Sequence, residues 1–183
     1  MTPARLALAS AALASLVACS ASESGEQTVS SVTICDPNAA PQDEADLPDV
    51  ALIAEAIESL RGELGAEPEF FEVNATARLV NLFVALNGAT MVQPWLYADG
   101  TLSTQPAREA VGGTFTADLI AVDPGSVFDT VRAEVPDAVI ETFYVHGNGE
   151  GGVQYGLLAS TVCGGGFDIT IGPGGAVLAV DPA

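Results

Sequence analysis

Positive charge is scarce in this chain of 183 residues. It contains no lysine and five arginines, against 24 aspartates and glutamates, so its formal net charge is −19. Nucleic-acid binding depends on basic groups that neutralise phosphates, and attraction to an anionic membrane surface needs clusters of such groups. We therefore expect no nucleic-acid partner. A cationic partner, a divalent metal or a role of the charge in solubility alone stay open.

Groups that carry chemistry are also scarce. His146 is the only histidine, and neither a GxSxG sequence nor a CxxC pair occurs. A nucleophile–base pair or a zinc site needs several such groups in a defined arrangement. The acidic tract CDPNAAPQDEAD lacks the spacing of an EF-hand loop and is interpreted as solvated. We expect no catalytic, cofactor-binding or metal-ligating residues, and hence a protein that is not an enzyme.

The first 18 residues differ in character from the rest of the chain. Arg5 precedes an apolar run from Leu6 to Ala18, and the polar tract SASESGEQ follows shortly after it. A basic start, a short apolar stretch and small residues at its end are typical of a secretory signal peptide. The run is too short for a transmembrane helix. Residues 1–18 are therefore predicted to be removed from the mature protein.

The apolar run ends in Leu16-Val17-Ala18-Cys19, which resembles the lipobox of bacterial lipoproteins. This resemblance implies cleavage before Cys19, attachment of its thiol to diacylglycerol, and acylation of its amine, for example with palmitate. It also implies a lipid-anchored protein outside the cytoplasm. Because Ser20 rather than an aspartate follows, the resemblance favours the outer membrane where one exists, and otherwise the outer face of the plasma membrane. The alternative is an ordinary signal peptide followed by an incidental cysteine.

Two further cysteines, Cys35 and Cys163, remain after Cys19 is assigned to the anchor. Disulfides form and persist in the oxidising compartments outside the cytoplasm. We predict a Cys35–Cys163 disulfide, which would close a long loop and contribute roughly 4–5 kcal/mol in the chain-entropy description. The alternative is a pair of separately buried thiols.

Residues 19–46 are predicted to be a lipidated cysteine followed by a flexible acidic linker, because this tract has too few apolar residues to form a core. The domain proper is predicted to span residues 47–183. It opens with an amphipathic helix in which Val50, Ile53, Ile57, Leu60 and Leu64 form one apolar stripe. Aspartates before this helix and a glycine at position 65 are typical start and stop signals.

A second helix is predicted from Asp123 and Pro124 to the residue before Pro136. Strand-like segments rich in β-branched and aromatic residues follow each helix. Asn87-Gly88 and Asp99-Gly100 lie between apolar runs and predict hairpin turns.

Landmarks in the two halves lie at nearly constant separations, which suggests an internal repeat. The matched landmarks are Val50 and Val127 (77 residues apart), Gly88 and Gly165 (77), Gly100 and Gly175 (75), and the segments EFFEVN and ETFYVH (72). We predict an α+β fold of two α-β-β-β repeats, about 47–105 and about 123–181. This order resembles PepSY-type modules and the tandem β-lactamase-inhibitor architecture. The resemblance implies an antiparallel sheet with both helices on one face.

Two classes of function are compatible with these features. The first is a lipid-anchored envelope protein that acts as a non-enzymatic protein-binding or inhibitory module, with an envelope protein as partner. The second is a carrier of a small apolar ligand, or an envelope enzyme, with a pocket between sheet and helices. A flat, exposed aromatic patch would favour the first, and convergent polar groups inside a cavity would favour the second.

Overall fold

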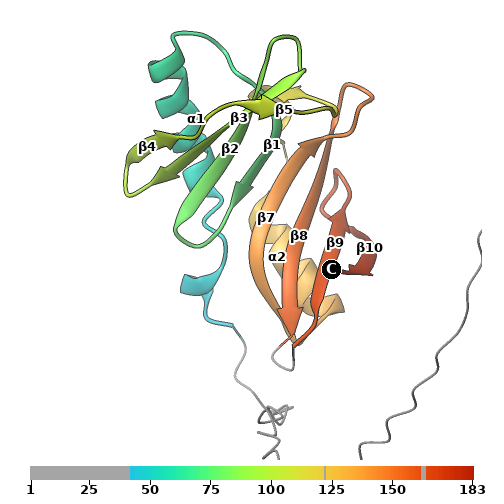
Figure 1. Cartoon of the computed structure of the whole chain (residues 1–183). Helices are drawn as coiled ribbons and strands as arrows, with labels where there is room; N and C mark the ends of the chain where they lie inside the picture. Colours follow the sequence, from blue (N-terminus) through green and yellow to red (C-terminus); the bar gives the residue numbers. More distant parts are fainter. Residues whose placement is uncertain (1–41, 122, 162–163) are drawn as a thin grey trace, which may run out of the picture. The chain divides into compact units, whose positions relative to one another are not determined.

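The computed structural model describes residues 42–121, 123–161 and 164–183 (Figure 1). They form a ten-stranded sheet in which every paired strand is antiparallel, together with two α-helices. The α+β class is therefore confirmed. Within these described residues, no helix is long and apolar enough to cross a membrane. The predicted signal peptide, Cys19, Cys35 and Cys163 lie outside the described residues.

The elements follow one another in two similar series. The first series is η1 (Glu44–Asp46), α1 (Ala51–Leu64), β1 (Glu69–Ala75), β2 (Leu79–Leu86), β3 (Met91–Ala98) and β4 (Thr101–Thr104). A connecting segment holds β5 (Arg108–Glu109), β6 (Phe115–Thr116) and η2 (Ala117–Leu119). The second series is α2 (Pro124–Glu134), β7 (Ala138–Gly147), β8 (Val153–Thr161), β9 (Gly166–Ile171) and β10 (Val177–Pro182).

Each α-helix is followed by four main strands, so the predicted three-strand unit is wrong in strand number. Asp99 and Gly100 both have positive φ, 50° and 73°, as a two-residue type I′ turn requires. This turn pairs Ala98 with Thr101 and folds the short strand β4 back onto β3. In the second series, a turn that contains Gly175 (φ 84°) returns the chain as β10.

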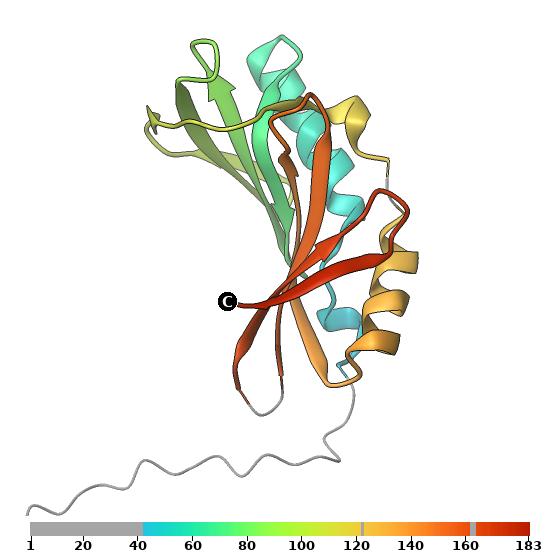
Figure 2. The ribbon, with the colours of Figure 1, turned by 90° about the vertical axis from the view of Figure 1, so that its right-hand side faces the viewer.

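The two series meet at the centre of the sheet. The strand order is β10-β9-β8-β7-β1-β2-β3-β4, and β1 contacts β7 through four residue pairs. Val73 pairs with Val145, and both side chains are fully buried. Both α-helices cover the same face of the sheet, as predicted, and leave the other face without a helix (Figure 2).

The helices begin and end where the sequence signals lie. Asp49 accepts a hydrogen bond from the backbone N–H of Ala51 at 3.2 Å, and Gly65 ends α1 with a φ of 65°. Asp123 caps α2 by accepting from Gly125 at 3.1 Å. The residues that the helices bury include Ile53, Ala56, Ile57 and Leu60 from α1, and Val127, Phe128 and Val131 from α2.

The described residues begin at Gln42, ahead of the predicted domain boundary at residue 47. The side-chain amide of Gln42 donates to the carbonyl of Ile140 and accepts from its N–H, both at 2.8 Å. The side-chain amide of Gln42 therefore bonds to β7 in the way that the backbone of a neighbouring strand would. Asp43 then caps η1 through the N–H of Ala45.

Candidate functional site

The helix-free face of the sheet carries a row of polar side chains near its centre. Asn74 on β1 is paired in register with Asn81 on β2 and Tyr144 on β7, and Glu72 is paired with His146. Asn81 donates to Asn74 at 2.8 Å, and Asn74 donates to Glu72 at 2.7 Å. The side-chain bonds therefore join β1 to β2, and the strand register places them beside Tyr144 and His146 of the second series.

Tyr144 extends this polar row across the second series. Its ring stacks on His146 with a centroid distance of 5.5 Å, and its hydroxyl donates to Asp168 on β9 at 2.5 Å. To reach β9, the ring crosses β8 at Gly156, where a Cβ atom would lie 2.2 Å from the ring. Burial, and next the hydrogen bond to Asp168, raise the pKa of the Tyr144 phenol above its ordinary value.

The sequence drew attention to His146 but not to its neighbour Tyr144. His146 lies at the end of β7, half-buried against Tyr144. The sequence predicts no catalytic role for His146 and offers no nucleophile to act with it. The sequence did not predict that the Tyr144 ring crosses Gly156 and bonds to Asp168. A glycine inside a strand-like segment is the signal that could have indicated a close approach of another group.

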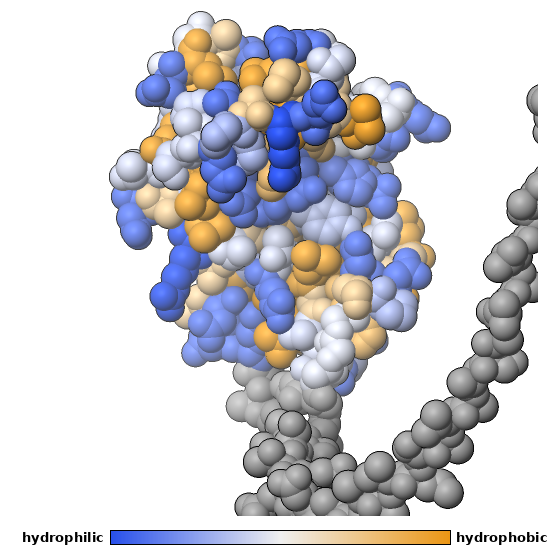
Figure 3. Space-filling model, viewed as in Figure 1, coloured by the Kyte–Doolittle hydropathy of each residue, from blue (hydrophilic) through white to orange (hydrophobic). Residues whose placement is uncertain are grey.

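The same face is more apolar over the first series. Four half-buried side chains on β2 and β3 lie on this face: Leu79, Phe83, Pro94 and Leu96. In the β2–β3 register, Phe83 is paired with Pro94, and Leu96 is paired with Asn81 of the polar row. The connecting segment passes over the ends of these strands (Figure 1). Its first strand, β5, pairs with β3, and its second, β6, pairs with β1. Between β5 and β6, Val111 is 96% exposed. Figure 3 shows this mixture of apolar and polar surface from the same side.

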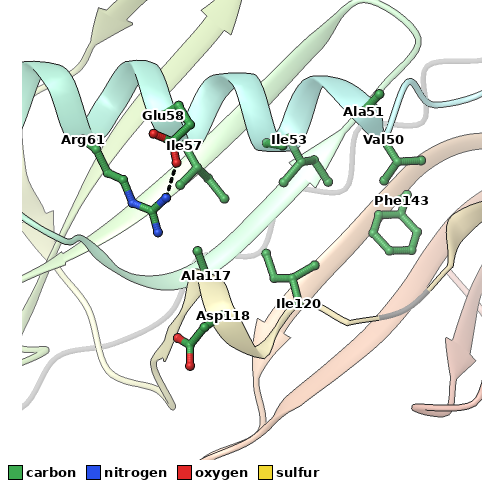
Figure 4. A pocket seen from close by; sticks show the side chains of 11 residues that line it. Val50, Ala51, Ile53, Ile57, Glu58, Arg61, Ala117, Asp118, Ile120 and Phe143 are labelled. Atoms are coloured by element: carbon green, nitrogen blue, oxygen red, sulfur yellow. Dashed lines mark hydrogen bonds and ion pairs between the residues drawn. The ribbon is translucent and has the colours of Figure 1, made fainter.

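The helix-covered side holds a groove of about 660 Å³ between α1 and the η2 segment (Figure 4). Its apolar lining includes Val50, Ile53, Ile57, Ile120 and Phe143. Ile53 and Ile57 are each only 4% exposed, and Phe143 is fully buried on β7. The groove is therefore walled by residues that also belong to the hydrophobic core.

Charged groups line the groove at the end away from Val50. They are Glu58 and Arg61 from α1, and Asp118 from η2 (Figure 4). Arg61 is held by Glu58 and, through two bonds of 2.5 and 2.7 Å, by Glu67. These bonds, to Glu67 first and then to Glu58, raise the pKa of Arg61 above its ordinary range. Asp118 accepts a hydrogen bond of 2.5 Å from the Thr116 hydroxyl.

The two surfaces differ in where their polar and charged groups lie. The groove has aliphatic walls, and its charged groups are confined to one end. On the open face, Tyr144 is engaged in holding strands together. Among residues 42–121, 123–161 and 164–183, no group of three or more His, Cys, Asp or Glu side chains could hold a metal ion.

Comparisons with known proteins give little further information. No family model matches the sequence, and no curated protein matches it. Among solved structures, the chain is similar to a putative lipoprotein from Clostridium difficile 630, with a TM-score of 0.49 and 10% sequence identity, over 78% of this chain and 97% of the other. At that identity and TM-score, the similarity carries no argument about site or function.

Proposed function

We propose that this protein is a lipid-anchored, non-enzymatic binding module of the cell envelope, and that its helix-free sheet face contacts a protein partner. The carrying observation is that eight strands lie in one continuous path while both α-helices cover a single face. Seven spacings of about 4.8 Å make this face roughly 34 Å wide. With strands about 20 Å long, its area is on the order of 700 Å², close to one side of a standard interface.

The side chains on this face support the proposal. The polar row is held by its own hydrogen bonds, so little conformational entropy would be lost on binding. The neighbouring apolar patch of Leu79, Phe83, Pro94 and Leu96 would supply the desolvated centre that interfaces need. The net charge of −19 would favour a cationic partner and faster association at low salt.

In-cell photocrosslinking in the native organism tests the proposed face. A photoreactive residue at Phe83 would crosslink to a partner if this face is the interface. The matched control is the same residue at Glu55, an exposed position on α1. Discrete adducts from position 83 alone would support the proposal, and adducts from position 55 alone would contradict it.

The membrane anchor is a separate part of the proposal and rests on the lipobox at Leu16 to Cys19. Replacement of Cys19 by alanine should release the protein into the soluble fraction or leave an unprocessed precursor. Fractionation followed by mass spectrometry of the N-terminus measures this. A mutant that matures normally and stays in the membrane would refute lipid attachment at Cys19.

We further propose that Cys35 and Cys163 are joined. Gln42 is hydrogen-bonded to Ile140, near the end of β7 where Ala138 pairs with Thr161. Cys35 lies seven positions before Gln42, and seven steps of the chain can span up to about 24 Å, so a bridge to the β8–β9 connection is within reach. Thiol labelling of the denatured, unreduced protein should modify neither cysteine.

We also propose that the two series arose as repeats. Their helices are each followed by four main strands, and both central strands carry a bulge, between Phe70 and Glu72 and between Ile140 and Thr142. These bulges are 70 residues apart, whereas the segments EFFEVN and ETFYVH match at 72. Burial follows the separation of 70, since Phe70, Val73 and Ala75 on β1 correspond to Ile140, Phe143 and Val145 on β7, and all six are fully buried.

A further inference from the structure

We infer that the groove between α1 and η2 binds a small cationic amphiphile, meaning a molecule with an apolar tail and one positively charged head group. This site lies on the helix-covered side of the sheet and does not depend on the partner proposed for the open face. Its volume of about 660 Å³ falls within the range of roughly 300–1,000 Å³ typical of small-molecule sites.

The apolar part of the groove suits a hydrocarbon tail. Ile53 and Ile57 line one wall and Ile120 the other, with Phe143 at the end near Val50 (Figure 4). Because Ile53, Ile57 and Phe143 are packed in the core, the groove exists without a ligand and needs little reorganisation to accept one. Each methylene of a tail that leaves water for this lining contributes about 0.8 kcal/mol.

The charged end of the groove decides the sign of the head group. Glu58 lies on α1 and Asp118 on η2, so carboxylates approach from two sides (Figure 4). Arg61 is the cation that lines this groove, and its guanidinium is already engaged by Glu58 and Glu67. An anionic head would therefore meet two carboxylates without a free positive charge. A cationic head would be attracted by Asp118 and by the net negative charge of the Arg61 cluster, in which Glu58 and Glu67 outnumber the guanidinium.

Isothermal titration calorimetry on the full chain carrying Cys19→Ser tests this site, with probes kept below their micelle concentrations. The probes are dodecyltrimethylammonium, dodecyl sulfate and dodecyl maltoside, which share one tail and differ in head charge. We expect saturable binding of one dodecyltrimethylammonium per chain, weaker binding of the maltoside, and no saturable binding of the sulfate. Equal affinity for the ammonium and the sulfate would overturn the inference, as would preference for the maltoside.

Three variants locate the binding. Ala54 lines the groove and is exposed, so Ala54→Trp should fill the groove, abolish binding and leave the fold intact by circular dichroism. Asp118→Asn should weaken binding of the ammonium about fivefold, the ratio expected for one partly exposed charge. Glu55→Gln removes the same charge from an exposed position on α1 that does not line the groove, and should leave the affinity unchanged.

Each contrary result has a definite meaning. Unchanged binding in Ala54→Trp would place the ammonium elsewhere, and an equal loss in Glu55→Gln and Asp118→Asn would reduce the effect to general attraction by an acidic surface. A dimer of the unliganded protein that Ala54→Trp abolishes in sedimentation would identify a second copy as the occupant. Any of these three results refutes the inference.

Discussion

The two faces of the sheet use polar and apolar side chains in opposite ways. On the open face, polar side chains lie near the centre and are tied to one another, as in the bonds among Glu72, Asn74 and Asn81. On the helix-covered face, the centre is apolar and the charged groups Glu58, Arg61 and Asp118 stay at one end of the groove. The open face is therefore stiffened by hydrogen bonds, and the covered face by packing.

Strand β7 contributes to both faces through consecutive residues. Phe143 points to the groove and the core, and Tyr144 lies on the open face beside His146. The alternation of side chains along a strand explains this division. It also means that substitutions one residue apart on β7 should probe two physically different kinds of stabilisation.

The largest expected effect comes from the packed face. Phe143→Ala would remove a fully buried ring that makes an edge contact with Phe128 at 6.3 Å. We expect a loss of about 3–5 kcal/mol in the free energy of unfolding, measured by chemical denaturation. The control Leu158→Ala, at a side chain 39% exposed on the open face of β8, should change it by less than about 1 kcal/mol. Similar losses in both variants would contradict the contrast between the faces.

An intermediate effect is expected where the open face is tightest. In Gly156→Ala, the new methyl group would lie 2.2 Å from the Tyr144 ring, so the ring must move. We expect a loss of about 1–3 kcal/mol in the free energy of unfolding. In a Tyr144→Ala background the same substitution should cost clearly less, because the two residues are coupled. Additive losses in this double-mutant cycle would show that the ring is not the cause.

The smallest effect concerns the hydrogen bond of that ring. Tyr144→Phe should lower the free energy of unfolding by about 1 kcal/mol near neutral pH. Because the pKa of Tyr144 is raised above its unfolded value of 10.0, this stabilisation is fully present below pH 10. It should then disappear as the pH rises from 10 through the raised pKa of the folded state.

Paired denaturation curves of wild type and Tyr144→Phe across this pH range measure the difference, and other titrating groups cancel. Convergence of the two stabilities above pH 10 is expected. A difference that stays constant or widens would rule out a raised pKa for this phenol.

The helices could be predicted from the sequence because their signals are local. Asp123 with Pro124, and Gly65, act within one turn of the helix ends that they define. Turn prediction was less uniform. Asp99-Gly100 forms a two-residue turn, whereas the turn at Asn87-Gly88 is a four-residue loop in which Ala89 also has a positive φ, 62°.

The surfaces could not be predicted, since they depend on strand pairing over long separations. Glu72 and His146 become neighbours only because β1 pairs with β7 in one register. The groove likewise depends on where η2 lies against α1. No spacing of residue types along the chain encodes either arrangement, because a shift of the register by one residue would exchange the two faces of each strand.

The pairing of Gln42 with Ile140 has a mechanical consequence. A pull applied to the backbone at Gln42 reaches these two hydrogen bonds, each 2.8 Å long, before it reaches α1. Both bonds belong to one side chain and would carry the load together, with a weaker contact of 3.4 Å from Arg132 to the Gln42 carbonyl beside them. Force would thus enter the sheet at Ile140, a fully buried residue. Helix α1 would carry no load until the hydrogen bonds of the Gln42 amide broke.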